Sequence, residues 1–126
     1  MTMKKARYFA PAVIFYILIF ILSSQHLDID LPGHGLDKVA HFFEFALQGL
    51  LLSLGFFNAF SLSPGLKSTL ALLTGLFMGI LDEFHQLFVP QRTSDIRDVL
   101  ADAAGIVAGI LVYRYLVGRK KRAPEN

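Results

Sequence analysis

The chain alternates between long apolar segments and short polar connections. An α-helix rises about 1.5 Å per residue, so crossing about 30 Å of hydrocarbon takes about 20 residues. Four segments have about this length, and they are Tyr8 to Ser24, Val39 to Phe60, Ser68 to Val89 and Asp98 to Val117. Strands are not expected, because the apolar runs do not alternate and are too long for a transmembrane barrel. We therefore predict an all-α polytopic membrane protein with four transmembrane helices.

Composition agrees with this class of protein. The chain has 126 residues, of which 54% are hydrophobic, and its mean hydropathy is +0.52. Soluble domains are typically about 45–50% apolar. We predict one domain over residues 1–126, with a membrane core at about 8–117 and a basic cytoplasmic tail at 118–126. No nucleic-acid module and no cofactor motif is recognisable, and no cysteine is present to form a disulfide.

Acidic and basic residues gather at opposite ends of the four segments. Nine of the ten acids and all four histidines fall at one end, and nine of the twelve bases fall at the other. The acidic end carries Asp28, Asp30, Asp37, Glu44, Asp82, Glu83, Asp95, Asp98 and Asp102, with His26, His34, His41 and His85. Cytoplasmic loops carry the excess of lysine and arginine. Both termini are therefore expected in the cytoplasm, and the acidic end is expected to face outward.

Three of the predicted helices carry a polar stripe with the spacing i, i+4, i+7, i+11, which places its members on one helical face. The stripes are Asp37, His41, Glu44 and Gln48; Gly75, Gly79, Asp82 and Gln86; and Asp98, Asp102, Gly105 and Gly109. The glycines of the last two stripes match in depth. Small residues allow close helix approach in lipid. We expect these two helices to pack through their glycines and the stripes to converge in an outer polar pocket.

The carboxylates in these stripes need partners. A charge at the bilayer centre costs roughly 2.5–3.5 kcal/mol on insertion scales. Glu44 lies about 10 Å below Asp37 along its helix, and His41 is the nearest candidate partner. Asp102 has the same need. A purely structural interpretation pairs the acids Asp82, Glu83, Asp98 and Asp102 with the bases Lys38, Arg92 and Arg97 as a clamp.

A second interpretation is a divalent-metal site, with imidazole and carboxylate ligands of the kind that zinc, manganese or iron accept. The candidate ligands are His41, Glu44, Asp82, Glu83, His85 and Asp102. Such a site would suit a metal-dependent membrane hydrolase acting on a lipid-linked substrate. No Ser-His-Asp arrangement is evident, so the sequence names no catalytic residue.

A third interpretation is recognition of an envelope lipid head group, and it is the one that we favour. Lys38, Arg92 and Arg97 would hold phosphate, because the planar arginine fork binds two oxygens at once. Carboxylates and Gln86 would hydrogen-bond sugar or amine groups. The candidate ligand-binding residues are Asp37, Lys38, His41, Glu44, Asp82, Glu83, Gln86, Arg92, Asp95, Arg97, Asp98 and Asp102.

Two segments resemble the VanZ-like family. They read Asp37-Lys38-x-x-His41-Phe42-x-Glu44 and Asp82-Glu83-x-x-Gln86-x-Phe88-x-Pro90-x-Arg92, followed by x-x-Asp95-x-x-Asp98 and the Gly105/Gly109 helix. The similarity spans roughly Tyr8 to Leu116. The family comprises small polytopic membrane proteins of bacteria and is named for a member associated with teicoplanin resistance.

The resemblance implies a multi-pass protein of the bacterial cytoplasmic membrane with an envelope-facing role, and it implies no enzyme class. Possible partners are the lipid bilayer and a lipid-linked envelope precursor or glycopeptide. The candidate site that it implies is Asp37, His41, Asp82, Glu83, Gln86, Arg92, Asp95 and Asp98. Where this chain has Asp102, members of the family often have an amide, which favours a hydrogen-bonding role at that position.

Overall fold

The computed structural model describes residues 3–25, 35–90, 92 and 94–122. The predicted outer-loop residues His26, Asp28, Asp30 and His34 lie outside the described residues. The elements are α1 (Met3–Ala6), a 3-10 turn η1 (Arg7–Phe9), α2 (Ala10–Ser23), α3 (Leu36–Ala59), α4 (Pro64–Gln86) and α5 (Ile96–Arg122). No strand occurs within the described ranges. The predicted all-α fold is confirmed.

Three helical stretches are long and apolar enough to cross a membrane. They are Leu36–Ala59, Pro64–Gln86 and Ile96–Lys120. The first apolar segment forms a shorter helix over Arg7–Ser23. Pro11 lies in the first turn of α2, where its missing N–H breaks no helical bond. The structure therefore shows three candidate spans and one shorter apolar helix, where the sequence predicts four full spans.

Helix boundaries depend on local capping. Ser63 caps α4, because its side chain accepts a hydrogen bond from the Leu66 N–H and Pro64 follows at the first helical position. Gly35 occupies the N-cap of α3, and Asp37 lies in the first turn of that helix. Helix α5 continues through Gly118 to Arg122. A helical glycine costs only about 1 kcal/mol relative to alanine, so the helix-forming residues after it prolong the helix.

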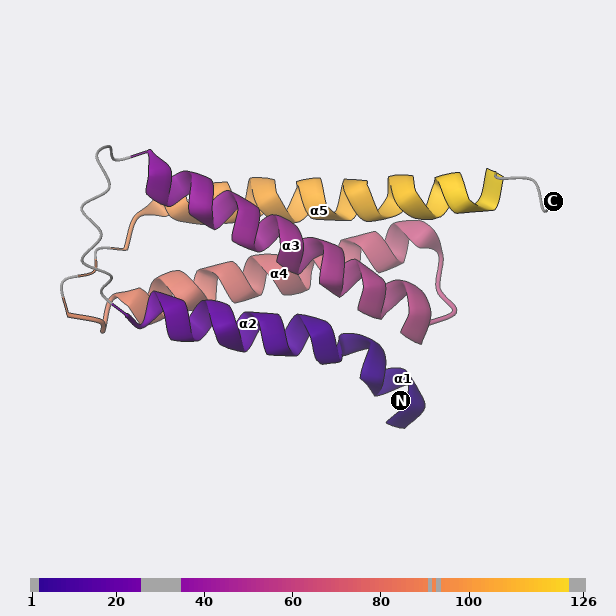
Figure 1. Ribbon diagram of the computed structural model, residues 1–126, viewed down its shortest axis with the longest axis horizontal. Helices are drawn as coiled ribbons and strands as arrows, with labels where there is room; N and C mark the ends of the chain where they lie inside the picture. Colours follow the sequence, from indigo (N-terminus) through magenta and orange to yellow (C-terminus); the bar gives the residue numbers. More distant parts are fainter. Residues whose placement is uncertain (1–2, 26–34, 91, 93, 123–126) are drawn as a thin grey trace.

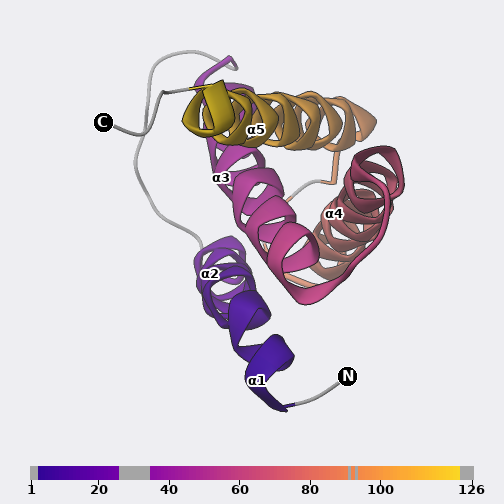
Figure 2. The same ribbon diagram turned by 90° about the vertical axis from the view of Figure 1, so that its right-hand side faces the viewer.

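Successive helices run in alternating directions (Figure 1). At one end of the bundle α2 and α4 finish and α3 and α5 begin, and we call this the polar end. Seen along the bundle, α3 lies between α2 on one side and α4 and α5 on the other (Figure 2). Residues near the start of α3 and α5 are thus brought beside residues near the end of α4.

The closest helix crossing joins α3 and α5. A Cβ added to Gly105 would clash with the carbonyl oxygen of Phe42, and one added to Gly109 would clash with that of Ala46. A Cβ on Gly49 of α3 would in turn lie 2.5 Å from the carbonyl oxygen of Ile106. Such bare glycine surfaces let two helix backbones approach in direct contact.

The prediction that α4 and α5 pack glycine against glycine is therefore wrong. Gly75 and Gly79 of α4 do face α5, but they meet the side chains of Ile106 and Asp102 instead of its backbone. Sequence spacing correctly places the glycines on one face of each helix. It does not specify which neighbouring helix that face meets.

Compared with a soluble protein, the bundle has its apolar and polar side chains reversed between surface and interior. Its outer surface carries large apolar side chains, among them Ile14 at 67% exposure and Phe43 at 65%. Its interior holds polar groups, including Gln48 and Ser53, which are fully buried. A soluble protein rarely exposes so much apolar surface. This distribution suits an exterior that contacts lipid and an interior where polar groups bond to one another.

Candidate functional site

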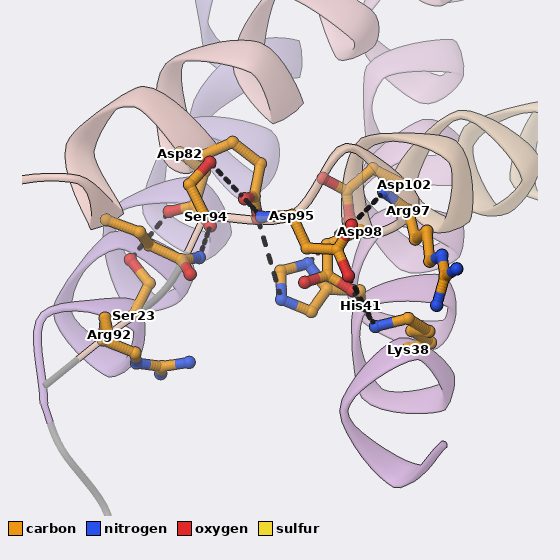
Figure 3. A network of polar contacts seen from close by, with 12 residues as sticks. Ser23, Lys38, His41, Asp82, Arg92, Ser94, Asp95, Arg97, Asp98 and Asp102 are labelled. Atoms are coloured by element: carbon orange, nitrogen blue, oxygen red, sulfur yellow. Dashed lines mark hydrogen bonds and ion pairs between the residues drawn. The ribbon is translucent and has the colours of Figure 1, made fainter. Parts of the chain in front are cut away.

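Six predicted site residues are buried together at the polar end. Each is 5% exposed or less, and they are His41 on α3, Asp82, Glu83 and Gln86 on α4, and Asp98 and Asp102 on α5. The helices begin or end a short distance away, so these groups lie within about two turns of the bundle's end. Figure 3 shows most of them converging. Members of all three predicted stripes therefore lie together at the polar end, but Asp37 and Glu44 are not in the buried group.

His41 lies between two acids. Its Nδ1 is 2.9 Å from Oδ1 of Asp102, and its Nε2 is 4.0 Å from Oε1 of Glu83. Because a carboxylate only accepts hydrogen bonds, Nδ1 is the donor to Asp102. The expected pairing of His41 with Glu44 is wrong: no hydrogen bond or ion pair to Glu44 occurs among the described residues, and Glu44 is half-buried. The imidazole turns toward α5 instead of along its own helix.

Asp82 ties α2 to α4. Its Oδ1 accepts a hydrogen bond of 2.7 Å from Ser23, and its Oδ2 accepts one of 2.9 Å from Gln86. Both donors are neutral, so the cationic partners that the clamp interpretation assigned to Asp82 are not the ones observed. Sequence reasoning missed Ser23. Its position at the polar end of an apolar segment, at the depth of Asp82, is the signal that could have identified it.

Glu83 organises the start of α5. Its Oε2 accepts hydrogen bonds from the Ser94 hydroxyl at 3.0 Å and from the Asp95 backbone N–H at 3.2 Å. Asp95 in turn caps α5 by accepting a 2.9 Å bond from the Arg97 backbone N–H. That hydrogen bond and the nearby Lys38 ammonium lower the pKa of Asp95, which keeps it ionised at the head of the helix.

The clamp interpretation holds for one base. Lys38 pairs with Asp98 at 3.0 Å and with Asp95 at 3.5 Å, which joins α3 to α5. Arg92 donates instead to the Gln25 carbonyl at 3.4 Å. Within the described part of the chain, neither Arg92 nor Arg97 forms an ion pair with a carboxylate. Both guanidinium groups point away from the buried acids in Figure 3.

The residues proposed as metal ligands divide into two groups. His41, Glu83 and Asp102 each offer a ligand atom, and these atoms lie within 4.8 Å of one another. His85 is not in this cluster, because it stacks on Phe20 and its Nε2 lies 2.9 Å from the Ser24 hydroxyl. Asp82 and Glu44 are also outside it. The structure therefore reduces the predicted metal set to one residue from each of α3, α4 and α5.

The fold and the buried site define a small helical protein with membrane-compatible helices and a charged cluster at one end. A family model described as VanZ/LLP1 matches residues 3–117. The chain belongs to the VanZ/LLP1 family, which confirms the resemblance found from the sequence.

A search of curated proteins gives a relative in Schizosaccharomyces pombe that is described only as uncharacterized. It is 36% identical over 100 residues, which cover 79% of this chain and 59% of the relative. The chain thus spans less than two thirds of the length of that protein. No solved structure matches the chain.

Proposed function

We propose that the protein crosses the cytoplasmic membrane of a bacterium four times, with both termini in the cytoplasm and the polar end facing outward. The basic residues near the termini and in the turn after α3 support this orientation. The helix over Arg7–Ser23 has 17 residues, at the lower limit of a span. Its contacts with α3 and α4 place it beside the longer helices along most of its length.

We further propose that the polar end binds the head group of an envelope lipid. The observation that carries this is the pair of arginines, Arg92 and Arg97, which flank the buried acids without forming ion pairs to them in the described residues. Guanidinium groups at a membrane surface are suited to phosphate oxygens. The half-exposed Lys38 and Asp95 lie at the same rim and could contact polar head-group atoms.

The relative in Schizosaccharomyces pombe bears on the choice of ligand. A phosphate-bearing lipid occurs in yeast and in bacteria, so it accounts for the whole family more simply than a bacterial glycopeptide does. Within a bacterium, a lipid-linked envelope precursor belongs to the same chemical class. A contribution to teicoplanin resistance would follow if such a precursor were the ligand bound here.

Arginine replacement tests this binding. We expect Arg97→Lys or Arg92→Lys to weaken binding of a phosphate-bearing lipid about tenfold, because lysine keeps the charge but loses the two-pronged contact. Binding is measured with purified protein and a panel of defined lipids, beginning with those that co-purify. Arg114→Lys on the opposite half of α5 is the matched control and should bind normally. If Arg92→Lys and Arg97→Lys bind the lipid as tightly as the Arg114→Lys control does, this role for the arginines is excluded.

Cysteine labelling tests the orientation, because the natural chain contains no cysteine. Phe88→Cys lies at the polar end and Ser61→Cys lies in the turn between α3 and α4, and both positions are exposed. In intact cells, a membrane-impermeant thiol reagent should label Phe88→Cys and should label Ser61→Cys only after lysis. The reverse pattern would place the polar end in the cytoplasm.

A further inference from the structure

The strongest unassigned feature is the cluster of His41, Glu83 and Asp102. These side chains come from three different helices, and the exposed fractions of the three residues are 5%, 3% and 1%. One ligand atom from each lies within 4.8 Å of the other two. Figure 3 shows the imidazole of His41 turned toward the neighbouring acids. The site exists only when all three helices are packed together.

Two carboxylate oxygens in this cluster are unpartnered. Glu83 binds Ser94 and the Asp95 N–H through Oε2, and its buried Oε1 has no hydrogen-bond partner within the described chain. Asp102 binds His41 through Oδ1, and its buried Oδ2 likewise has none there. A buried polar atom left without a partner costs about 1–3 kcal/mol, and more when it is charged. Oε1 of Glu83 faces Nε2 of His41 and is available to a ligand between them, whereas Oδ2 of Asp102 lies toward Gly79 of α4.

The arrangement of His41 matches that of a metal-binding histidine. Its Nδ1 donates to Asp102, which leaves Nε2 as the free acceptor. A carboxylate bound to the second ring nitrogen commonly orients a metal-binding imidazole. Nε2 faces Oε1 of Glu83 at 4.0 Å, too far for a hydrogen bond. A tetrahedral ion bonded to both atoms at about 2.0–2.2 Å would bring them closer together than this by less than about 1 Å.

The charge balance also favours a cation. The buried carboxylates at the polar end are those of Asp82, Glu83, Asp98 and Asp102. Lys38 pairs with Asp98, and His41 bonds to Asp102. The other two acids receive hydrogen bonds only from neutral donors in the described structure. Buried charges in proteins are normally paired or bound to a metal.

We propose that Nε2 of His41 and Oε1 of Glu83 bind one divalent transition-metal ion, with Asp102 orienting the imidazole through Nδ1. An imidazole and a carboxylate suit zinc, manganese or iron(II), and two protein ligands leave coordination positions for water or ligand oxygens. A second possible set, Asp37, His41 and Asp98, shares the histidine. It fits less well, because Lys38 already neutralises Asp98 and Asp37 is exposed. The metal site goes beyond head-group binding and does not depend on it.

Metal titration of the full chain tests the site. The protein is purified in detergent, treated with a chelator, and titrated separately with zinc and manganese by calorimetry. We expect one tightly bound ion per chain and a higher unfolding temperature after loading. Glu83→Gln and Asp102→Asn keep the side-chain shapes and should each weaken binding at least tenfold. His85→Ala is the control, because His85 lies outside the cluster, and it should bind like the natural protein.

Absence of stoichiometric binding by folded protein would overturn the proposal. So would unchanged binding in both Glu83→Gln and Asp102→Asn, or binding that only His85→Ala removes. If the two variants do not fold, X-ray absorption of the zinc-loaded natural protein decides the question. One imidazole with oxygen ligands at about 2.0–2.2 Å is expected, and two or more imidazoles would contradict the assignment. The protein is stripped of lipid beforehand, so failure of head-group binding leaves this result unaffected.

Discussion

Gly109→Val is expected to destabilise the bundle by about 3 kcal/mol or more. Overpacking a well-packed interior typically costs about 1–3 kcal/mol, and more where the surroundings cannot move. A Cβ at Gly109 would overlap the backbone oxygen of Ala46 and lie 2.7 Å from the Leu50 nitrogen. Backbone atoms cannot rotate aside as side chains can, so α3 and α5 would have to separate. Thermal unfolding in detergent, followed by circular dichroism, measures the loss.

Gly118→Val is the matched control. Gly118 lies on the same helix, and nothing lies within 4 Å of an added Cβ. Its replacement should change stability by no more than about 0.5 kcal/mol. Gly75→Ala should give an intermediate loss, because its Cβ would meet side-chain atoms of Ile106 at 3.0 Å, and these can shift. Equal stability of Gly109→Val and Gly118→Val would contradict the close α3–α5 crossing.

The fold was largely predictable from the sequence because its main determinant is the length of apolar runs. The three long helices follow the predicted segments, and the cap at Ser63 follows from local chemistry alone. The partner of the α5 glycines was not predictable in the same way. Periodicity specifies a helical face, whereas the choice between α3 and α4 depends on how three surfaces pack together.

The candidate site was predictable as a set of residues but not as a set of contacts. The sequence places His41, Asp82, Glu83 and Asp102 at one end of the bundle, and the structure buries all four there. Which atoms meet depends on helix rotation, and so the His41 ring reaches Asp102 instead of Glu44. Ser23 was missed because a serine at the end of an apolar segment carries no periodic signal, although its bond to Asp82 closes α2 onto the bundle.

The second large effect is expected at the His41–Asp102 pair, in protein stripped of metal. Removing one partner of a buried charged pair typically costs about 3–5 kcal/mol, because the other is left uncompensated. His41→Leu leaves the buried carboxylate of Asp102 without its hydrogen-bond donor. Asp102→Leu leaves Nδ1 of His41 without its acceptor. Each single variant should therefore lose about 3–5 kcal/mol of unfolding free energy.

The double variant shows whether these losses share one cause. If His41 and Asp102 act as a pair, His41→Leu with Asp102→Leu should cost about 1–3 kcal/mol less than the sum of the single losses. Asp102→Asn should lose far less than Asp102→Leu, because an amide oxygen can still accept the bond from Nδ1. Unfolding of all four proteins in the same detergent gives the coupling. Strictly additive losses would mean that the 2.9 Å contact does not link the stabilities of α3 and α5.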